Sequence, residues 1–232
     1  MMRGIVRYPD LRMMLFFVFL LVPIFLLAYR IEPSAYEFSL APLTFVAISL
    51  LFLLLSIIEI PIISKKMKKP RYTDSEIQTR ERLYSVSREE IEGDEGGLYD
   101  AVITLNLGGF ILPLIFALYI AIISELAIEE LVIITIIMIT ATNLLTIIEP
   151  GVGIITPSPT GLLALPLAMI VTPSDVTTGM LVSGIIGIEL GLLTKIFAID
   201  IEVGSPIFSI GGKGNFESIF LVVMLGLLFS LV

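Results

Sequence analysis

The stretch that decides the class of fold runs from Val176 to Ile199 and reads VTTGMLVSGIIGIELGLLTKIFAI. Its 24 residues exceed the roughly 20 that a helix needs to cross a bilayer. Only Glu189 and Lys195 carry charge. Small residues recur at every fourth position, at Gly179, Ser183, Gly187 and Gly191. This pattern predicts a transmembrane helix that packs closely on a neighbouring helix along its small-residue stripe.

The rest of the chain has the same apolar character. Of 232 residues, 56% are hydrophobic and 16% are charged, against about 45–50% and about 25% in a typical soluble domain. One soluble core of this size cannot hide that excess, because such a domain still exposes roughly a quarter to a third of its surface. The composition therefore argues against soluble, disordered and nucleic-acid-binding proteins. It predicts an all-α polytopic transmembrane helix bundle.

We expect about seven hydrophobic segments in this bundle, by the length needed to cross a bilayer. They are Met13–Tyr29, Phe38–Ile58, Ala101–Ser124, Leu131–Ile148, Gly161–Val171, Val176–Ile199 and Phe216–Val232. Residues 149–160 read EPGVGIITPSPT, which is nearly apolar but rich in proline. This stretch is expected to be a broken or re-entrant segment, covered by protein or lining a wet cavity.

Basic residues are concentrated in the first 88 positions, which hold 12 of the 14 Lys and Arg residues. Lys and Arg residues beside membrane spans favour the cytoplasm. We therefore expect the N-terminus and the loop 65–100 on the cytoplasmic side of the cell membrane, and the C-terminus on the outer side. The chain then divides into a transmembrane hairpin (1–64), this charged loop with a short helix around 75–90, and a transmembrane bundle (101–232). The expected partner is the lipid bilayer. Lys65–Lys69 also suit anionic headgroups, although a topology signal alone is the simpler interpretation.

The sequence contains no His and no Cys. Their absence removes Ser-His-Asp and Cys-His catalysis, thiolate and imidazole metal sites, and disulfides. Any proton chemistry must therefore use Asp, Glu, Lys, Tyr or Arg. No cofactor and no metal site is predicted.

Two carboxylates lack an obvious structural explanation, and we predict them as a catalytic pair. Glu189 lies 13 residues after Val176, or about 20 Å along a helix, which is mid-bilayer. An ionisable group at that depth suggests a functional site, the alternative being a polar pairing that fixes helix packing. Lys195 is a poor partner for it on the same helix. Glu217 follows a Gly-rich approach and is either within the membrane or an interfacial carboxylate stabilised by the helix dipole.

Several neutral residues are candidates for either substrate binding or helix packing. An intramembrane Asn usually hydrogen-bonds to another helix, and adjacent glycines allow the close approach. Asn143 is interpreted in the same way, and Glu59, at the end of the second segment, is expected to be interfacial. The candidates are Asn106, Gly108, Gly109, Gly211, Gly212, Gly214 and Asn215.

Five segments together resemble a prokaryotic membrane family known as domain of unknown function 1614, over roughly two thirds of the chain. The strongest part runs from Gly204 to Phe220, with Gly-Ser-Pro followed by Ser-Ile-Gly-Gly and Phe-Glu. The resemblance implies that Asp is typical at the positions of Glu189 and Glu217. Glu at these positions keeps the negative charge on a longer side chain. It implies no activity. The other segments are Ser56–Pro61, Leu105–Tyr119, Pro150–Ile154 and Gly184–Leu190.

A weaker likeness is to presenilin-like and prepilin-peptidase-like intramembrane aspartyl proteases, which use two membrane Asp residues, one of them within Gly-x-Gly-Asp. Here Gly212-Lys213-Gly214 is followed by Asn215, and the acid comes two residues later. Three hypotheses follow. The first is an intramembrane acid-pair hydrolase that uses Glu189 and Glu217. The second is a proton- or cation-coupled transporter that uses the same carboxylates. The third is a non-catalytic membrane scaffold.

Overall fold

A computed structural model describes residues 11–30, 42–68, 72–84, 88, 98–197, 205 and 207–231. The α-helices are α1 (Leu11–Arg30), α2 (Pro42–Leu55), α3 (Asp74–Tyr84), α5 (Leu112–Ile123), α6 (Ile128–Leu145), α7 (Ala164–Val171), α8 (Val176–Phe197) and α9 (Phe216–Phe229). A π-helical turn η2 (Leu107–Ile111) precedes α5, and a 3-10 helix η3 (Ser158–Leu163) precedes α7. The strands are β1 (Glu59–Lys68), β2 (Leu98–Asn106), β3 (Ile147–Glu149), β4 (Gly153–Ile155) and β5 (Ile207–Ile210).

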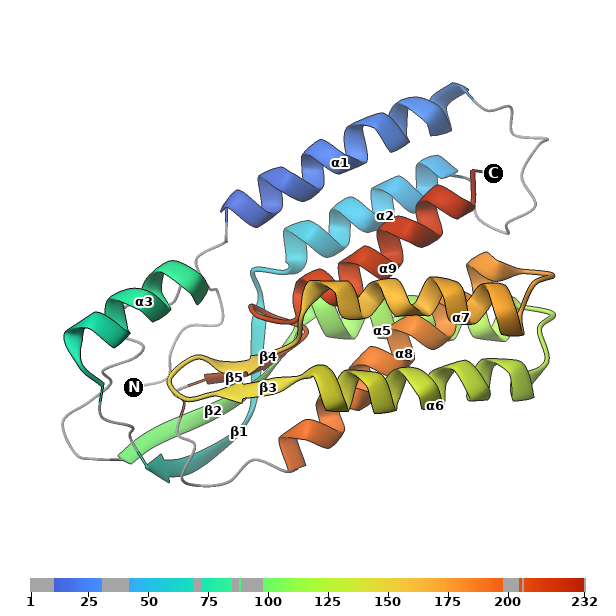
Figure 1. The fold of residues 1–232 in the computed structure, drawn as a ribbon. Coiled ribbons are helices and arrows are strands. Elements are labelled where there is room, and N and C mark those ends of the chain that lie inside the picture. Colours follow the sequence, from blue (N-terminus) through green and yellow to red (C-terminus); the bar gives the residue numbers. More distant parts are fainter. Residues whose placement is uncertain are drawn as a thin grey trace.

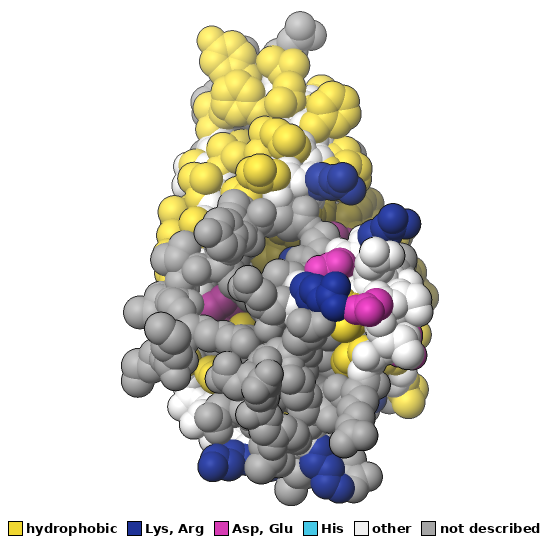
Figure 2. Space-filling view, turned by 90° about the vertical axis from the view of Figure 1, so that its left-hand side faces the viewer, with side chains coloured by type: hydrophobic (Ala, Val, Ile, Leu, Met, Phe, Trp, Pro, Cys, Tyr) yellow, Lys and Arg dark blue, Asp and Glu magenta, His cyan; other side chains and the backbone are white. Residues whose placement is uncertain are grey.

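The apolar helices form a bundle, and the strands and α3 gather at one end of it (Figure 1). Successive apolar helices run alternately toward and away from that end. There β1, β2, the β3–β4 hairpin and β5 lie in the connections between them. Figure 2 looks at this end, where Lys, Arg, Asp and Glu side chains are visible below the hydrophobic side chains. The strands and α3, with the Lys and Arg side chains near them, are thus collected at one end of the helices.

The prediction of an all-α fold is wrong in one respect, because a three-stranded sheet joins the bundle. β1 pairs with β2 antiparallel, and β2 pairs with β5 parallel, in the order β1-β2-β5. The first six residues of the predicted segment Ala101–Ser124 are therefore strand, and the helix begins only after Asn106. β1 is an edge strand, which is the place in a sheet where Pro61 is tolerated.

Residues 149–160 have regular structure. They complete the β3–β4 hairpin, in which Ile148 pairs with Ile154, and then enter η3. Thr156 N donates a hydrogen bond to Gly214 O at 2.8 Å, so the stretch is anchored to the loop before α9. The backbone polar groups of this proline-rich segment are thereby partly satisfied by protein.

The small-residue stripe on α8 packs as predicted. The Ser183 hydroxyl donates to Leu131 O on α6 at 2.9 Å. A Cβ added to Gly187 would overlap Met138 of α6, and one added to Gly191 would overlap Thr142 of α6. Asn143 also bonds across the pair of helices as expected, because its Nδ2 donates to the Thr194 hydroxyl at 2.9 Å. The absence of large side chains lets α6 and α8 approach closely.

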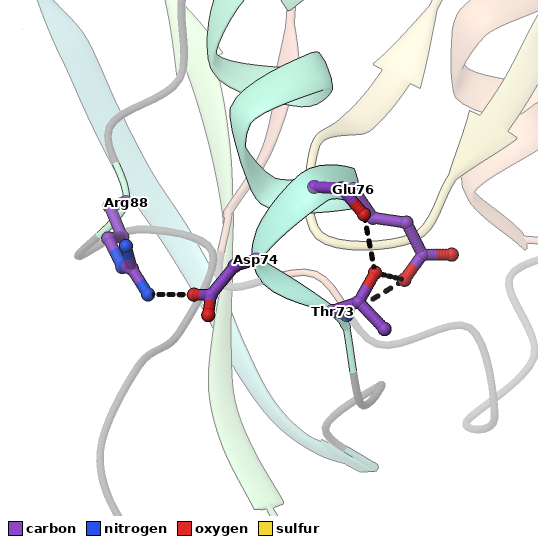
Figure 3. Close-up of polar contacts among 5 residues, drawn as sticks. Thr73, Asp74, Glu76 and Arg88 are labelled. Atoms are coloured by element: carbon purple, nitrogen blue, oxygen red, sulfur yellow. Dashed lines mark hydrogen bonds and ion pairs between the residues drawn. The ribbon is translucent and has the colours of Figure 1, made fainter.

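The short helix expected around 75–90 is present as α3. Thr73 lies directly before it, and its N–H and its hydroxyl both donate to Glu76 Oε2 at 2.8 Å (Figure 3). The N–H bond is the half of a capping box that the Glu side chain provides. Asp74 in the first turn forms an ion pair with Arg88. Ile77 packs with Tyr72 and Val152, so α3 rests on the tip of the β3–β4 hairpin through a small apolar cluster.

One hydrophobic core connects the predicted N-terminal hairpin with the rest of the chain. Phe17 of α1 lies edge-on to Phe220 of α9, with 4.7 Å between ring centroids. Phe45 of α2 contacts Phe116 of α5 at 5.3 Å. Among the described residues, two helices, α6 and α8, are long and apolar enough to cross a membrane. The other apolar helices are shorter.

Candidate functional site

A buried polar network surrounds Glu59, the first residue of β1. The side chain is 5% exposed, so it is surrounded by protein, and its expected position near the membrane interface stays a prediction. Its Oε2 accepts a hydrogen bond from the Thr104 hydroxyl at 2.6 Å, and its Oε1 accepts one from the Ser209 hydroxyl at 2.6 Å. Asn106 Nδ2 donates to Oε1 at 3.2 Å. The carboxylate of β1 thus accepts hydrogen bonds from two residues of β2 and one residue of β5.

The strands explain why these side chains meet. Glu59 lies opposite Asn106 in the antiparallel pair, and Ser209 lies opposite Thr104 in the parallel pair. Residues that face each other across neighbouring strands have their Cβ atoms about 4.5–5.5 Å apart, which suits short polar side chains. Burial in a low-dielectric core makes each of these hydrogen bonds consequential, because an unsatisfied donor would have no water to bind.

Asn106 serves as a connector between the sheet and the helices. Its Oδ1 accepts a hydrogen bond from Gly109 N at 2.8 Å and so caps η2, while its Nδ2 also donates to Ser56 O at 2.6 Å. The sequence predicts that Asn106 hydrogen-bonds to another helix, whereas its partners outside η2 lie in the turn after α2, at Ser56, and in β1, at Glu59. Gly108 allows η2 to lie against α2, because an added Cβ would overlap Phe52 O.

The glycine loop 211–214 closes the network from the other side. Gly109 and Gly211 meet backbone to backbone, since a Cβ on Gly109 would lie 1.8 Å from Gly211 O. A Cβ on Gly212 would overlap both the Ser209 hydroxyl and Glu59 Oε1. Gly214 has a φ of 97°, a conformation that favours glycine. These glycines therefore serve close packing around Glu59.

Asn215 follows this loop and is completely buried. Its Nδ2 donates to Ser209 O at 3.0 Å and to Ile154 O at 3.4 Å. The side chain therefore joins β4, β5 and the start of α9. Among the described residues, its Oδ1 has no hydrogen-bond partner.

Glu189 lies in the middle of the bundle and is 1% exposed. Neither of its carboxylate oxygens has a hydrogen-bond partner among the described residues. Lys195 does not neutralise it through a hydrogen bond, because its Nζ donates to Asn143 O at 3.0 Å. Glu189 is separated by about 200° from Gly187 and Gly191 around the helix, so it points away from α6.

Glu217 has a different environment. It lies in the first turn of α9, is exposed, and accepts a hydrogen bond from the Ser158 hydroxyl. No hydrogen bond joins it to Glu189. A carboxylate near a helix N-terminus is favoured by the helix dipole. The structure therefore brings Asn106, Gly109, Gly211, Gly212 and Asn215 together around Glu59, and gives Glu189 and Glu217 separate hydrogen-bonding environments.

Sequence reasoning missed Glu59 as a member of the site. Its partners Thr104, Asn106 and Ser209 lie 45, 47 and 150 residues away along the chain, so no local spacing identifies it. A signal was present nonetheless, because Glu59 lies in one of the resembling segments. Four of those segments converge at this network, contributing Glu59, Asn106, Ile154 and Asn215 among others. Among the described residues, no group of three or more His, Cys, Asp or Glu side chains gathers to hold a metal ion.

The chain was compared with known proteins and protein families. No curated protein matches the chain, and no solved structure does. The likeness to presenilin-like proteases therefore has no counterpart in the comparisons. A model of one protein family, described as protein of unknown function (DUF1614), matches residues 53–229, which include both the Glu59 network and Glu189. The chain belongs to the DUF1614 family.

Proposed function

We propose that this protein is a multi-pass membrane protein of the cell membrane that couples the movement of protons or cations to transport, with Glu189 as the titrating group. The membrane part of the proposal is supported by the outer surface of the bundle. Large apolar side chains are exposed on four helices, including Phe19 of α1 (73%), Ile122 of α5 (82%), Leu144 of α6 (76%) and Ile170 of α7 (76%). Soluble monomers rarely expose apolar surface over so many adjacent elements.

The burial of α6 and α8, the two described helices that are long and apolar enough to cross a membrane, supports the same conclusion. Only 22% of the α6 window Ile128–Leu145 is buried, whereas 61% of the α8 window is buried. The core helix of a soluble protein would be mostly buried, so α6 is better suited to contact lipid. α8 is then an inner helix, with α6 between it and the bilayer.

The orientation follows from where the polar connections lie. The strands and α3 gather at one end of the bundle (Figure 1), and this end carries Lys65, Lys66 and Lys68 as exposed residues of β1. Basic residues beside membrane spans favour the cytoplasm. We therefore assign this end, with the N-terminus and the loop 65–100, to the cytoplasmic side, and the seven apolar segments cross the bilayer.

The observation that carries the proposed activity is the isolation of Glu189. A charged carboxylate buried without a partner costs several kcal/mol, and an ionisable residue inside a membrane bundle marks an ion or proton pathway by default. The Gly- and Pro-rich breaks before η3 and before α9 resemble the broken helices from which transporters build polar sites at depth.

The hydrolase and scaffold hypotheses have less support. Two acids that share one proton must approach within hydrogen-bond distance, whereas Glu217 is exposed and bonded to Ser158. A carboxyl that only specifies packing would be expected to have hydrogen-bond partners, as Glu59 has. Glu189 has neither an acid partner nor a packing partner for its oxygens.

Flux measurements in liposomes test this function. The protein is reconstituted with a trapped pH-sensitive dye, and a membrane potential is imposed with potassium and valinomycin. We expect wild-type proton or cation flux above that of empty liposomes, and loss of that flux in Glu189→Gln. Glu129→Gln makes the same chemical change at an exposed position on α6 and is expected to keep the flux.

Two outcomes would contradict the proposal. One is wild-type protein that conducts no more than empty liposomes, and the other is Glu189→Gln that conducts as well as wild type. Cleavage of a transmembrane reporter peptide that requires both Glu189 and Glu217 would instead support the acid-pair hydrolase.

A further inference from the structure

The orientation of the Asn215 amide is determined by its surroundings. Both of its Nδ2 hydrogens are used, one on Ser209 O and one on Ile154 O. Turning the amide over would place Oδ1 against these two carbonyl oxygens, which are acceptors and cannot donate. Oδ1 must therefore point the other way, into a fully buried position where no described group donates to it.

Two threonine hydroxyls share this property. Thr160 of η3 and Thr142 of α6 are 2% and 0% exposed, and neither hydroxyl has a hydrogen-bond partner in the part of the chain that the structure describes. Buried polar atoms in folded proteins nearly always have a partner, so each such exception requires an explanation. One bound ligand in contact with all three oxygens would give each of them a partner.

The segments that carry these oxygens are held together. The stretch containing Thr160 is tied to the start of α9 at three points: Thr156 N donates to Gly214 O, the Ser158 hydroxyl donates to Glu217, and Gly161 lies directly against Ser218 O. Asn215 lies between Gly214 and Glu217, two of the residues that make these contacts.

Helix α6 joins the same arrangement. The hydroxyl of Thr146, one turn after Thr142, shares a hydrogen bond of 2.8 Å with the hydroxyl of Thr156. The end of α6 is thereby fastened to the segment that leads to Thr160. Three segments that each carry an unpartnered buried oxygen thus meet at one end of the bundle.

We propose that Asn215 Oδ1, Thr160 Oγ1 and Thr142 Oγ1 bind a sodium ion. This inference rests on the transport activity proposed above and names its coupling ion. Hard cations take oxygen ligands, and these three are an amide carbonyl and two hydroxyls. All three are neutral, which suits a monovalent ion, because a divalent ion would keep two uncompensated charges in apolar surroundings. Unwound segments beside half-helices are where transporters hold such ions.

Sodium-dependent stability tests the site directly. The full chain is purified in detergent, and its thermal unfolding midpoint is measured against increasing NaCl, with choline chloride used to keep the ionic strength constant. We expect the midpoint to rise with sodium and to be unchanged when choline alone is present, because a ligand that binds only the native state stabilises it.

Matched threonine variants locate the effect. Thr160→Val removes a hydroxyl that has no partner in the protein, so the midpoint in choline should stay the same or rise, while the apparent sodium affinity should fall about tenfold. Thr140→Val makes the same change on the exposed face of α6 and should keep the wild-type sodium affinity. Thr142→Val should behave as Thr160→Val does.

Equal midpoints in sodium and choline would mean that an ordered water only fills the site, and would overturn the inference. Wild-type sodium affinity in both Thr160→Val and Thr142→Val would also overturn it. Flux that depends on Glu189 while sodium binding is absent would refute the sodium site alone. Sodium binding without flux that depends on Glu189 would refute the proposed transport and leave the site intact.

Discussion

Removing the Glu59 carboxylate is the most demanding test of the buried network. Glu59→Ala would leave the Thr104 and Ser209 hydroxyls and the Asn106 amide without their shared acceptor, in a site where Glu59 itself is only 5% exposed. Glu59→Gln keeps one carbonyl oxygen for two of these donors. Its new amide donates to the remaining hydroxyl, which can rotate to accept.

The structure sets the magnitudes. A hydrogen bond to a charged group contributes about 1.5–3 kcal/mol, and a buried donor left without its acceptor costs about 1–3 kcal/mol. Because three neutral donors lose their acceptor, we expect Glu59→Ala to lose about 3 kcal/mol or more of unfolding free energy. Glu59→Gln should lose about 1–2 kcal/mol. For a chain of this size, each kcal/mol lowers the melting temperature by about 2–4 °C.

The assay is thermal unfolding of the detergent-purified protein, followed by circular dichroism at one protein concentration. The expected order of melting temperatures is wild type, then Glu59→Gln, then Glu59→Ala. Glu129→Gln is the control for a carboxylate exposed on α6 and should melt with wild type. The reasoning is refuted if Glu59→Ala melts within a degree or so of wild type, or if Gln and Ala at this position are equally damaging.

Three further predictions concern packing and helix capping. Gly109→Ala should lower the free energy of unfolding by about 3 kcal/mol or more, because the new methyl meets the Gly211 backbone, which cannot move aside as a side chain can. Thermal unfolding checks this, and wild-type melting would contradict it. Gly187→Ala should lower the free energy of unfolding by about 1–3 kcal/mol, because the new methyl separates α8 from Met138 of α6. Its melting temperature should lie between those of wild type and Gly109→Ala. Thr73→Ala removes the hydrogen bond from the Thr73 hydroxyl to Glu76 Oε2 (Figure 3) and should weaken α3 by about 0.5–1 kcal/mol. Hydrogen exchange should show this as faster exchange of the α3 amides without lower global melting, and unchanged exchange would contradict it.

Regular helices could be predicted where the apolar pattern was long and uninterrupted. The segment expected at Val176–Ile199 contains α8, Val176–Phe197, and the segment expected at Leu131–Ile148 overlaps α6, Ile128–Leu145. The helix expected around 75–90 is α3. In these cases length, composition and capping act within one segment, so the sequence of that segment suffices.

The strands could not be predicted in the same way. Residues 101–106 form an apolar run that fits a buried strand as well as a helix, and length alone favoured the helix. Their identity as β2 depends on β1 before them and on β5 about a hundred residues after them. In β1 the lysines that indicate a solvated loop are also typical of a protected edge strand.

The sequence by itself determined the apolar character of the helices and the side chains that the chemistry of this protein can use. Apolar runs of bilayer length, a basic loop, and the absence of His and Cys are properties of composition and spacing. The tertiary structure alone decided the state of each buried acid. Glu59 has hydrogen-bond partners from two neighbouring strands, and Glu189 has none among the described residues, although both are carboxylates beside apolar runs. The physical reason is that a hydrogen bond depends on distances of about 3 Å between atoms, and only the folded chain brings such distant residues that close.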